Sequence, residues 1–414
     1  MSTECIATLT IPSESPEHVS LPAPTHGRER LDLRVLDAMS ARFADDPDIA
    51  LAVGGASKIS VIDRDGGGLL YRGYPVEQLA GQCDFLEVAC LLMDGELPDA
   101  MQKTSFAAAI RQHLPVHEQM VRLYEGFRRD ADPLAVMVGV VGALSAFHPE
   151  AAGRPGAGQR SLGCRQLVAK MPAIVAMAYK YSIGLPFMRP RADLGYSANF
   201  LYMMSGTPCE EYTPDPVRVR ALDALLILHA DHGQDAATST LRMAGASGAS
   251  PFACVCAAIA CLSGHSQGGA AACLAMLEQI GDASQIIDLI ARVGHGEGGL
   301  ALPGFRQSAA GYLDPLTLPL RKLCKDVLGE LDLENDRLFK QAMLVEKAAL
   351  DDPHCAERNL QPNPDFYTGV ILAALGVAPS MFTSIVALAR TPGWTAHWEE
   401  ALANLDCRAA GCSA

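Results

Sequence analysis

The chain has 414 residues, and with 33 basic and 47 acidic side chains its formal net charge is −14. Its composition, 49% hydrophobic and 19% charged, is typical of a globular protein, and this length is enough to bury a large core. The acidic balance argues against a nucleic-acid partner, because phosphate contacts need clustered lysine and arginine. Its apolar runs are shorter than the roughly 20 residues that a membrane span requires, so no membrane partner is expected.

The cysteines and the first residues bear on the compartment. There are 13 cysteines, an odd number, and no two of them form a CxxC pair. This usage is typical of a reducing environment, where cysteine often acts as a small buried hydrophobic residue. Residues 1–24 have neither early basic residues nor a long apolar core, unlike a signal peptide. We therefore expect a cytoplasmic protein.

In chain order, the first 28 residues are rich in Ser, Pro and Thr, and they predict a disordered N-terminal arm. Two short apolar runs, 58–62 and 69–71, flank an Asp- and Gly-rich turn and predict a β-hairpin. From Pro75 onward the apolar residues recur at helical spacing, which predicts an all-α fold. Helices that are apolar nearly all round are expected at 251–262 and 369–391.

Several local patterns can carry chemistry, and local sequence leaves each of them open. His229 and His232 have a spacing that suits either a metal site or plain hydrogen bonding, and we expect no metal. A glycine-rich turn at 264–269 opens a helix at 270–279, either as an anion cradle or as a tight connection. Asp365 is either a helix N-cap or a carboxylate base in a cleft. Arg390 either binds a carboxylate or satisfies the last carbonyls of a helix.

Taken together, these segments resemble citrate synthase of the bacterial type over residues 30–402. The resemblance rests on a series of motifs that occur in order along the chain. These are IDRDGGGLLYRGYP at 62–75, FRRD at 127–130, SGTPC at 205–209, ILHADHGQ at 227–234, NPDFY at 363–367 and ARTPGWTAHW at 389–398.

The resemblance implies a fold of two helical domains that close over the substrates. The large domain would comprise residues 29–276 and 386–414, and the small domain residues 277–385. It also implies a homodimer or a hexamer. Acyl-CoA and a 2-oxo acid are the small molecules implied as substrates, and no cofactor is implied.

Carried over position by position, the resemblance gives a partly altered active site. Asp365 falls on the aspartate that deprotonates the acyl-CoA methyl group. His232 falls on a histidine that binds oxaloacetate, and Arg390 falls on one of the arginines that clamp it. Gln267 and Gln307 stand where the family has its two catalytic histidines. Glutamine can donate a hydrogen bond, but it cannot transfer a proton near neutral pH.

The acceptor-binding positions have changed as well. Leu316 replaces a substrate-binding arginine of the family, whereas Arg306, beside Gln307, is an unusual cation for this loop and is a candidate substrate-binding residue. Two hypotheses follow. The chain is a divergent condensing enzyme whose acceptor carries fewer carboxylates than oxaloacetate. Alternatively, it is a catalytically inactive homologue that serves as a regulatory or structural partner, for example in a mixed oligomer with a genuine citrate synthase.

Overall fold

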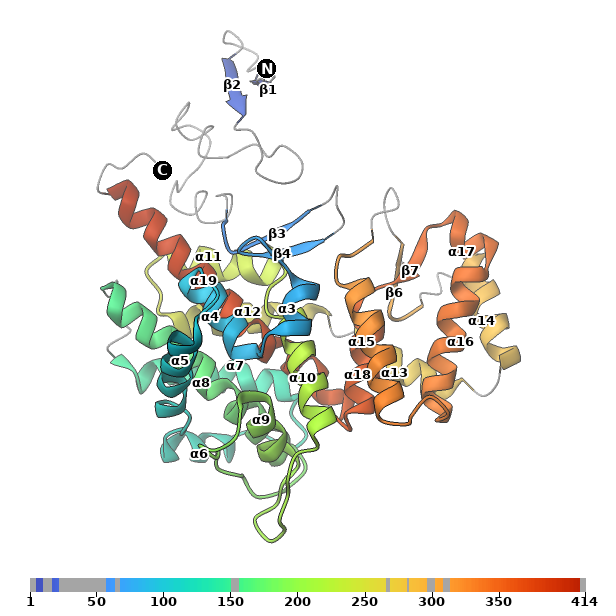
Figure 1. The fold of residues 1–414 in the computed structure, drawn as a ribbon, viewed down its shortest axis with the longest axis horizontal. Helices are drawn as coiled ribbons and strands as arrows, with labels where there is room; N and C mark the ends of the chain where they lie inside the picture. Colours follow the sequence, from blue (N-terminus) through green and yellow to red (C-terminus); the bar gives the residue numbers. More distant parts are fainter. Residues whose placement is uncertain are drawn as a thin grey trace.

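A computed structural model describes the chain in nine segments. These are residues 5–9, 17–21, 57–63, 68–149, 156–265, 269–280, 283–295, 302–307 and 313–409. Helices dominate these segments, so the predicted all-α class is confirmed (Figure 1).

The helices follow one another with short connections. In the first half they are α3 (Val76–Gln82), α4 (Phe85–Asp94), α5 (Ala100–Gln112), α6 (Glu118–Tyr124), α7 (Pro133–Ala143), α8 (Ala157–Ser182), α9 (Tyr196–Ser205) and α10 (Pro216–Leu228). In the second half they are α11 (Ala236–Ala246), α12 (Pro251–Leu262), α13 (Ala270–Gln279), α14 (Ala283–Gly294), α15 (Thr317–Glu330), α16 (Arg337–Asp351), α17 (Pro353–Glu357), α18 (Pro364–Ala374) and α19 (Phe382–Ala409). The predicted helices at 251–262 and 270–279 are therefore confirmed as α12 and α13.

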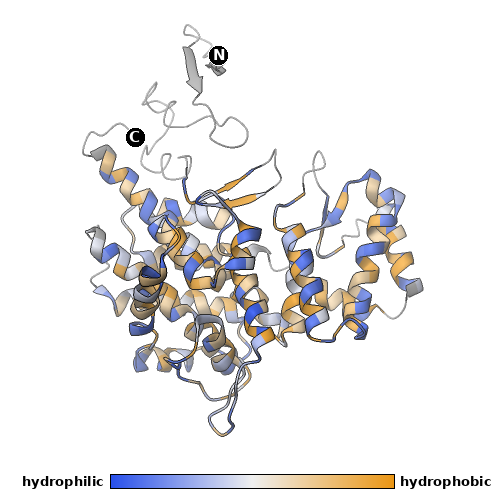
Figure 2. Ribbon diagram, in the orientation of Figure 1, coloured by the Kyte–Doolittle hydropathy of each residue, from blue (hydrophilic) through white to orange (hydrophobic). Residues whose placement is uncertain are grey.

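The predicted hairpin at 58–71 is confirmed. Strands β3 (Ser60–Ile62) and β4 (Leu69–Tyr71) pair antiparallel, with Ser60 opposite Tyr71, and β5 (Tyr74–Pro75) adds a third short strand. Figure 2 colours β3 and β4 largely as hydrophobic, and the side chains of Leu69 and Tyr71 are fully buried. The hairpin is thus part of the core and not only a surface turn.

Two further strand pairs were not predicted. Strands β1 (Cys5–Leu9) and β2 (Glu17–Leu21) pair antiparallel, so these segments of the predicted disordered arm 1–28 have regular structure; the rest of the arm lies outside the described residues. Strands β6 (Phe305–Gln307) and β7 (Leu360–Pro362) also pair antiparallel. Strands of three residues carry too little alternation to be recognised in a sequence.

The expected single helix at 369–391 is wrong, because the structure divides it. Helix α18 ends at Ala374, and Gly376 follows with a left-handed φ of 78°. The amides of Gly376 and Val377 donate to the carbonyls of Ala373 and Leu372, the paired bonds of a Schellman ending. Pro379 then begins a 3₁₀ turn (Pro379–Met381) that leads into α19. The apolar pattern continues across this break because both helices are buried.

The helices form two lobes (Figure 1). Helix α19 runs through the larger lobe, where it packs against α4, α8, α11 and α12 and buries Trp394 and Trp398 completely. Helices α13 to α18 gather in a second lobe, which joins the first where α15 contacts α10. The proposed domain limits at 277 and 385 fall near this division and stay a prediction. No helix in the described part of the chain is both long and apolar enough to cross a membrane.

The close contact between α19 and the segment after α10 gives a stability prediction. A Cβ atom added at Gly393 would lie 2.6 Å from Oδ1 of Asp231 and would also meet the carbonyl oxygen of Ala230. We expect Gly393→Ala to destabilise the protein by about 1–3 kcal/mol or more, because backbone must move apart. Chemical denaturation measures this loss.

The matched control is Gly81→Ala, at an exposed helical glycine of α3 with no atom within 4 Å of the added Cβ. It should be neutral or stabilising by about 0.5–1 kcal/mol, since alanine favours the helix. Equal stability of the two variants would contradict the packing described at Gly393.

Candidate active site

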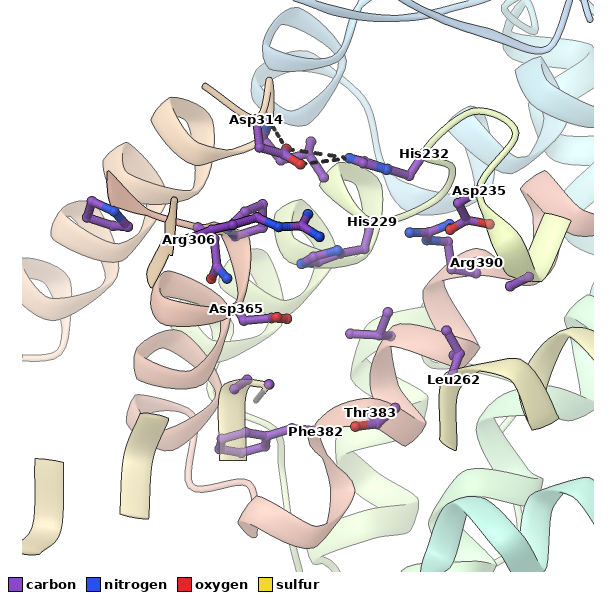
Figure 3. A pocket seen from close by; sticks show the side chains of 18 of the residues that line it. His229, His232, Asp235, Leu262, Arg306, Asp314, Asp365, Phe382, Thr383 and Arg390 are labelled. Atoms are coloured by element: carbon purple, nitrogen blue, oxygen red, sulfur yellow. Dashed lines mark hydrogen bonds and ion pairs between the residues drawn. The ribbon is translucent and has the colours of Figure 1, made fainter. Parts of the chain in front are cut away.

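A cavity of about 600 Å³ lies where the two lobes meet (Figure 3). The larger lobe contributes the segment between α10 and α11 and the first turns of α19. The other lobe contributes the start of α18, strand β6 and the segment before α15. Five of the six predicted site residues line this cavity: His232, Arg306, Gln307, Asp365 and Arg390. The sixth, Gln267, lies outside the described residues.

Buried hydrogen bonds of Asp231 hold the segment after α10 in place. This carboxylate has no exposed surface, and Nε2 of His397 lies 3.2 Å from its Oδ2 atom. The same oxygen accepts a hydrogen bond from the hydroxyl of Ser60 in the hairpin and one from the amide of Gly233. Burial alone would raise the pKa of Asp231, but the charge of His397 and these hydrogen bonds outweigh it and lower the pKa.

The hairpin and α19 add further contacts to this anchor. The Tyr71 hydroxyl lies 2.8 Å from the carbonyl oxygen of Asp231, and it accepts from the amide of the same residue at 3.0 Å. On the other side of His397, Nη1 of Arg242 lies 3.4 Å from Nδ1 and donates to Glu400 at 2.9 Å. The segment that carries the polar cavity residues is therefore held by two distant parts of the chain.

His229 is buried and bridges the two lobes. Its Nε2 atom lies 2.8 Å from Oγ1 of Thr368 on α18. Burial, with the nearby charges of Arg390 and His232, lowers the pKa of His229 to about 3, so its ring is neutral near pH 7. His229 and His232 thus have separate partners. Among the described residues no group of three His, Cys, Asp or Glu side chains is placed to hold a metal ion.

His232 faces a carboxylate across the cavity. Its Nε2 atom lies 3.2 Å from Oδ2 of Asp314, the residue that begins the segment before α15 (Figure 3). The other oxygen, Oδ1, accepts from the amide of Leu316 at 3.0 Å. Burial alone would raise the pKa of Asp314, but the hydrogen bond and charge of His232 together outweigh it, so the pKa is lowered overall. Asp314 is therefore ionised near neutral pH.

Arg390, on α19, is paired with a second carboxylate. Nη1 of Arg390 donates to Oδ2 of Asp235 at 2.7 Å, and the arginine is only 8% exposed. Oδ1 of Asp235 accepts from the amide of Thr238 and so caps α11. Burial raises the pKa of Asp235, but the charge of Arg390 and the cap lower it overall. The helix-end interpretation of Arg390 is wrong, because its partner is a side-chain carboxylate.

Asp365 occupies the first turn of α18. The N-cap of this helix is Asn363, whose side chain accepts from the amide of Phe366, so the N-cap interpretation of Asp365 is wrong. The Asp365 side chain is half-buried and points into the cavity (Figure 3). A negative charge in the first turn of a helix is stabilised by the helix dipole.

Strand β6 brings Arg306 and Gln307 to the cavity as exposed side chains. Its partner β7 leads directly into α18, and the amide of Asn363 donates to the carbonyl of Gly304 at 2.9 Å. This pairing sets Gln307 and Asp365 on the same wall. Leu316 also lies at the cavity wall, but it is only 1% exposed.

Asp235 and Asp314 are the cavity residues that the sequence analysis did not single out. Asp235 stands directly before α11 and Asp314 shortly before α15, positions where aspartate is common as a cap. Their contacts with Arg390 and His232 join residues 155 and 82 positions apart. No local signal distinguishes a capping aspartate that also meets a distant cation.

Comparison with known proteins identifies the family of this chain. Residues 51–408 match the family model described as "Citrate synthase, C-terminal domain", and the chain belongs to the citrate synthase family. Among solved structures, citrate synthase from Pyrobaculum aerophilum is 29% identical with a TM-score of 0.75, and the match covers 97% of this chain and 92% of that one. Citrate synthase from Thermotoga maritima is 25% identical with a TM-score of 0.70, over 83% and 88% of the two chains.

A third solved structure shares the fold at lower identity. It is citrate synthase from Thermoplasma acidophilum in a ternary complex with carboxymethyl coenzyme A and oxaloacetate. It is 22% identical to this chain, with a TM-score of 0.73 and coverage of 83% and 89%. Its two ligands belong to that protein.

The lowered pKa of His229 predicts a dependence of stability on pH. In the unfolded chain the imidazole takes up a proton below about pH 6.5, whereas in the folded protein it stays neutral down to about 3. The unfolded state therefore gains protons first as the pH falls, and folding stability decreases below about pH 6.5. His229→Gln should flatten the decrease between about pH 6.5 and about pH 4.5, as measured by denaturation at a series of pH values.

His117→Asn is the control, because it removes an exposed histidine at the N-cap of α6 and keeps a good capping residue. It shows what the exchange of a surface histidine for an amide does to stability. An unchanged slope in His229→Gln would show that this imidazole is not held neutral by burial.

Proposed function

We propose that this chain is a divergent condensing enzyme that joins the acyl group of an acyl-CoA to a 2-oxo acid, with Asp365 as its base. The observation that carries the proposal is the position of Asp365, in the first turn of α18 on the wall of a cavity that also holds Arg306 and Arg390. A carboxylate base and cations in one cavity suit the deprotonation of a carbon acid beside an anionic acceptor.

In the first step, Asp365 would take a proton from the carbon next to the thioester carbonyl, and negative charge would develop on the thioester oxygen. That oxygen needs hydrogen-bond donors. The amide of Gln307, exposed at the cavity, can donate such a bond, and Gln267 is proposed as a second donor. The enolate carbon would then attack the keto carbon of the acceptor, whose oxygen takes up a proton, and water would hydrolyse the CoA thioester.

For the second step, neither His229 nor Gln307 is suited to act as the acid. His229 is a neutral ring bound to Thr368, and glutamine at 307 cannot transfer a proton. General acid catalysis contributes about 10²–10⁴ in rate, so citrate formation from oxaloacetate should be slower by at least that factor. This supports weakened activity or an altered acceptor.

A second candidate function is that of an inactive partner subunit in a homodimer, a hexamer or a mixed oligomer with a genuine citrate synthase. It is favoured by the contacts of Arg390 and His232, each of which already faces a carboxylate of the chain. In either case we propose a cytoplasmic protein.

For the proposed function, we expect little CoA release from acetyl-CoA and oxaloacetate, and slow exchange of solvent deuterium into the methyl group of acetyl-CoA. Asp365→Asn should abolish the exchange, because an amide cannot accept the proton. Mass spectrometry of recovered acetyl-CoA measures the exchange.

Asp336→Asn is a matched control: it removes one carboxylate at the N-cap of α16, which does not line the cavity, and keeps a capping residue. It should exchange deuterium like the unaltered chain. Exchange that survives Asp365→Asn would contradict the assigned base. Calorimetry that detects no acyl-CoA binding would favour the partner-subunit function, and CoA release at an ordinary enzymatic rate would contradict the expected loss.

A further inference from the structure

The basic side chains of the cavity are unequally occupied. Arg390 is paired with Asp235 at 2.7 Å, and Nε2 of His232 lies 3.2 Å from Asp314. Arg306, on β6, is exposed to the cavity and has no ion pair within the described part of the chain. In Figure 3 Arg390 and Asp235 lie on the right of the view, and Arg306 lies to the left, below Asp314. At the end of the cavity that holds Arg390, the carboxylate of Asp235 therefore already offsets the positive charge, and we call this the neutralised end.

The cap that Asp235 provides does not explain its charge. Asp235 uses Oδ1 to accept the backbone N–H of Thr238 and turns Oδ2 to Arg390. Asparagine caps a helix as well as aspartate does. The negative charge of Asp235 therefore serves its ion pair with Arg390, and the cap of α11 does not require it.

We infer that Asp235 is a specificity-determining residue, and that it occupies the position on Arg390 that an acceptor carboxylate would otherwise take. The acceptor is then a 2-oxo acid with a single carboxylate, held by Arg306, and with an uncharged remainder directed toward the neutralised end. This inference rests on the proposed function, because it names the class of acceptor for that site.

Electrostatics and shape both favour such an acceptor. A second acceptor carboxylate near Arg390 would approach Asp235, and like charges in a partly buried site repel strongly. The arginine could accept it only by giving up its present partner. The partly exposed side chains of Leu313 and Val386 line the cavity, which suits an uncharged group better than a charged one.

The test compares the binding of pyruvate and of oxaloacetate by titration calorimetry, with no thioester present. The unaltered chain should bind pyruvate more tightly than oxaloacetate. Asp235→Asn keeps the cap of α11 and releases Arg390, so it should strengthen oxaloacetate binding by about tenfold to a hundredfold and change pyruvate binding little. Arg306→Gln should weaken pyruvate binding by a similar factor.

Asp336→Asn again controls for the loss of one negative charge from the protein and should alter neither affinity. Circular dichroism verifies that each variant is folded. The inference is overturned if the unaltered chain binds oxaloacetate as tightly as pyruvate, if it binds neither, or if folded Asp235→Asn gains no affinity for oxaloacetate.

The outcome is separable from that of the proposed function. Binding in the expected pattern without deuterium exchange would keep the specificity assignment and remove the catalytic role. Exchange that requires Asp365, together with tight oxaloacetate binding by the unaltered chain, would keep the catalytic role and overturn the specificity assignment.

Discussion

The geometry of the cavity depends on the burial of one carboxylate, that of Asp231. A fully buried charge is costly unless it is paired and hydrogen-bonded, and here a histidine, a serine hydroxyl and a backbone amide satisfy one of its oxygens. These partners come from the hairpin and from α19, so they fix the segment after α10 in one place. That segment carries His229, His232 and Asp235, and each faces a different partner. Losing the anchor would therefore disturb all of these contacts together.

The second feature of the cavity is that its charges are largely balanced by the chain. Arginines and histidines in a substrate cavity ordinarily serve an anionic ligand, and in this chain two of them face aspartates instead. Arg306, by contrast, has no ion pair within the described residues, and it lines the same cavity as Asp365. In the proposed function, Asp365 would serve as the base and Arg306 would hold the acceptor.

Much of the fold follows from local patterns, and the exceptions have physical causes. The hairpin at 58–71 and the helices at 251–262 and 270–279 are predicted because turn residues and apolar spacing mark them clearly. The break after Ala374 is hidden because both flanking helices are buried and apolar throughout. Local patterns single out Asp365, His232 and Arg390 but leave their roles open, and only the family resemblance assigns roles to them. Asp235 was missed because its partner lies 155 residues away.

The most direct test of the neutralised cavity is a double-mutant cycle on oxaloacetate affinity with Asp235→Asn, Arg390→Gln and the two combined. If Asp235 acts by occupying Arg390, the gain from Asp235→Asn requires the arginine and disappears in the combined variant. An equal gain with and without Arg390 would contradict the account, because the aspartate would then act on oxaloacetate by some route other than this ion pair.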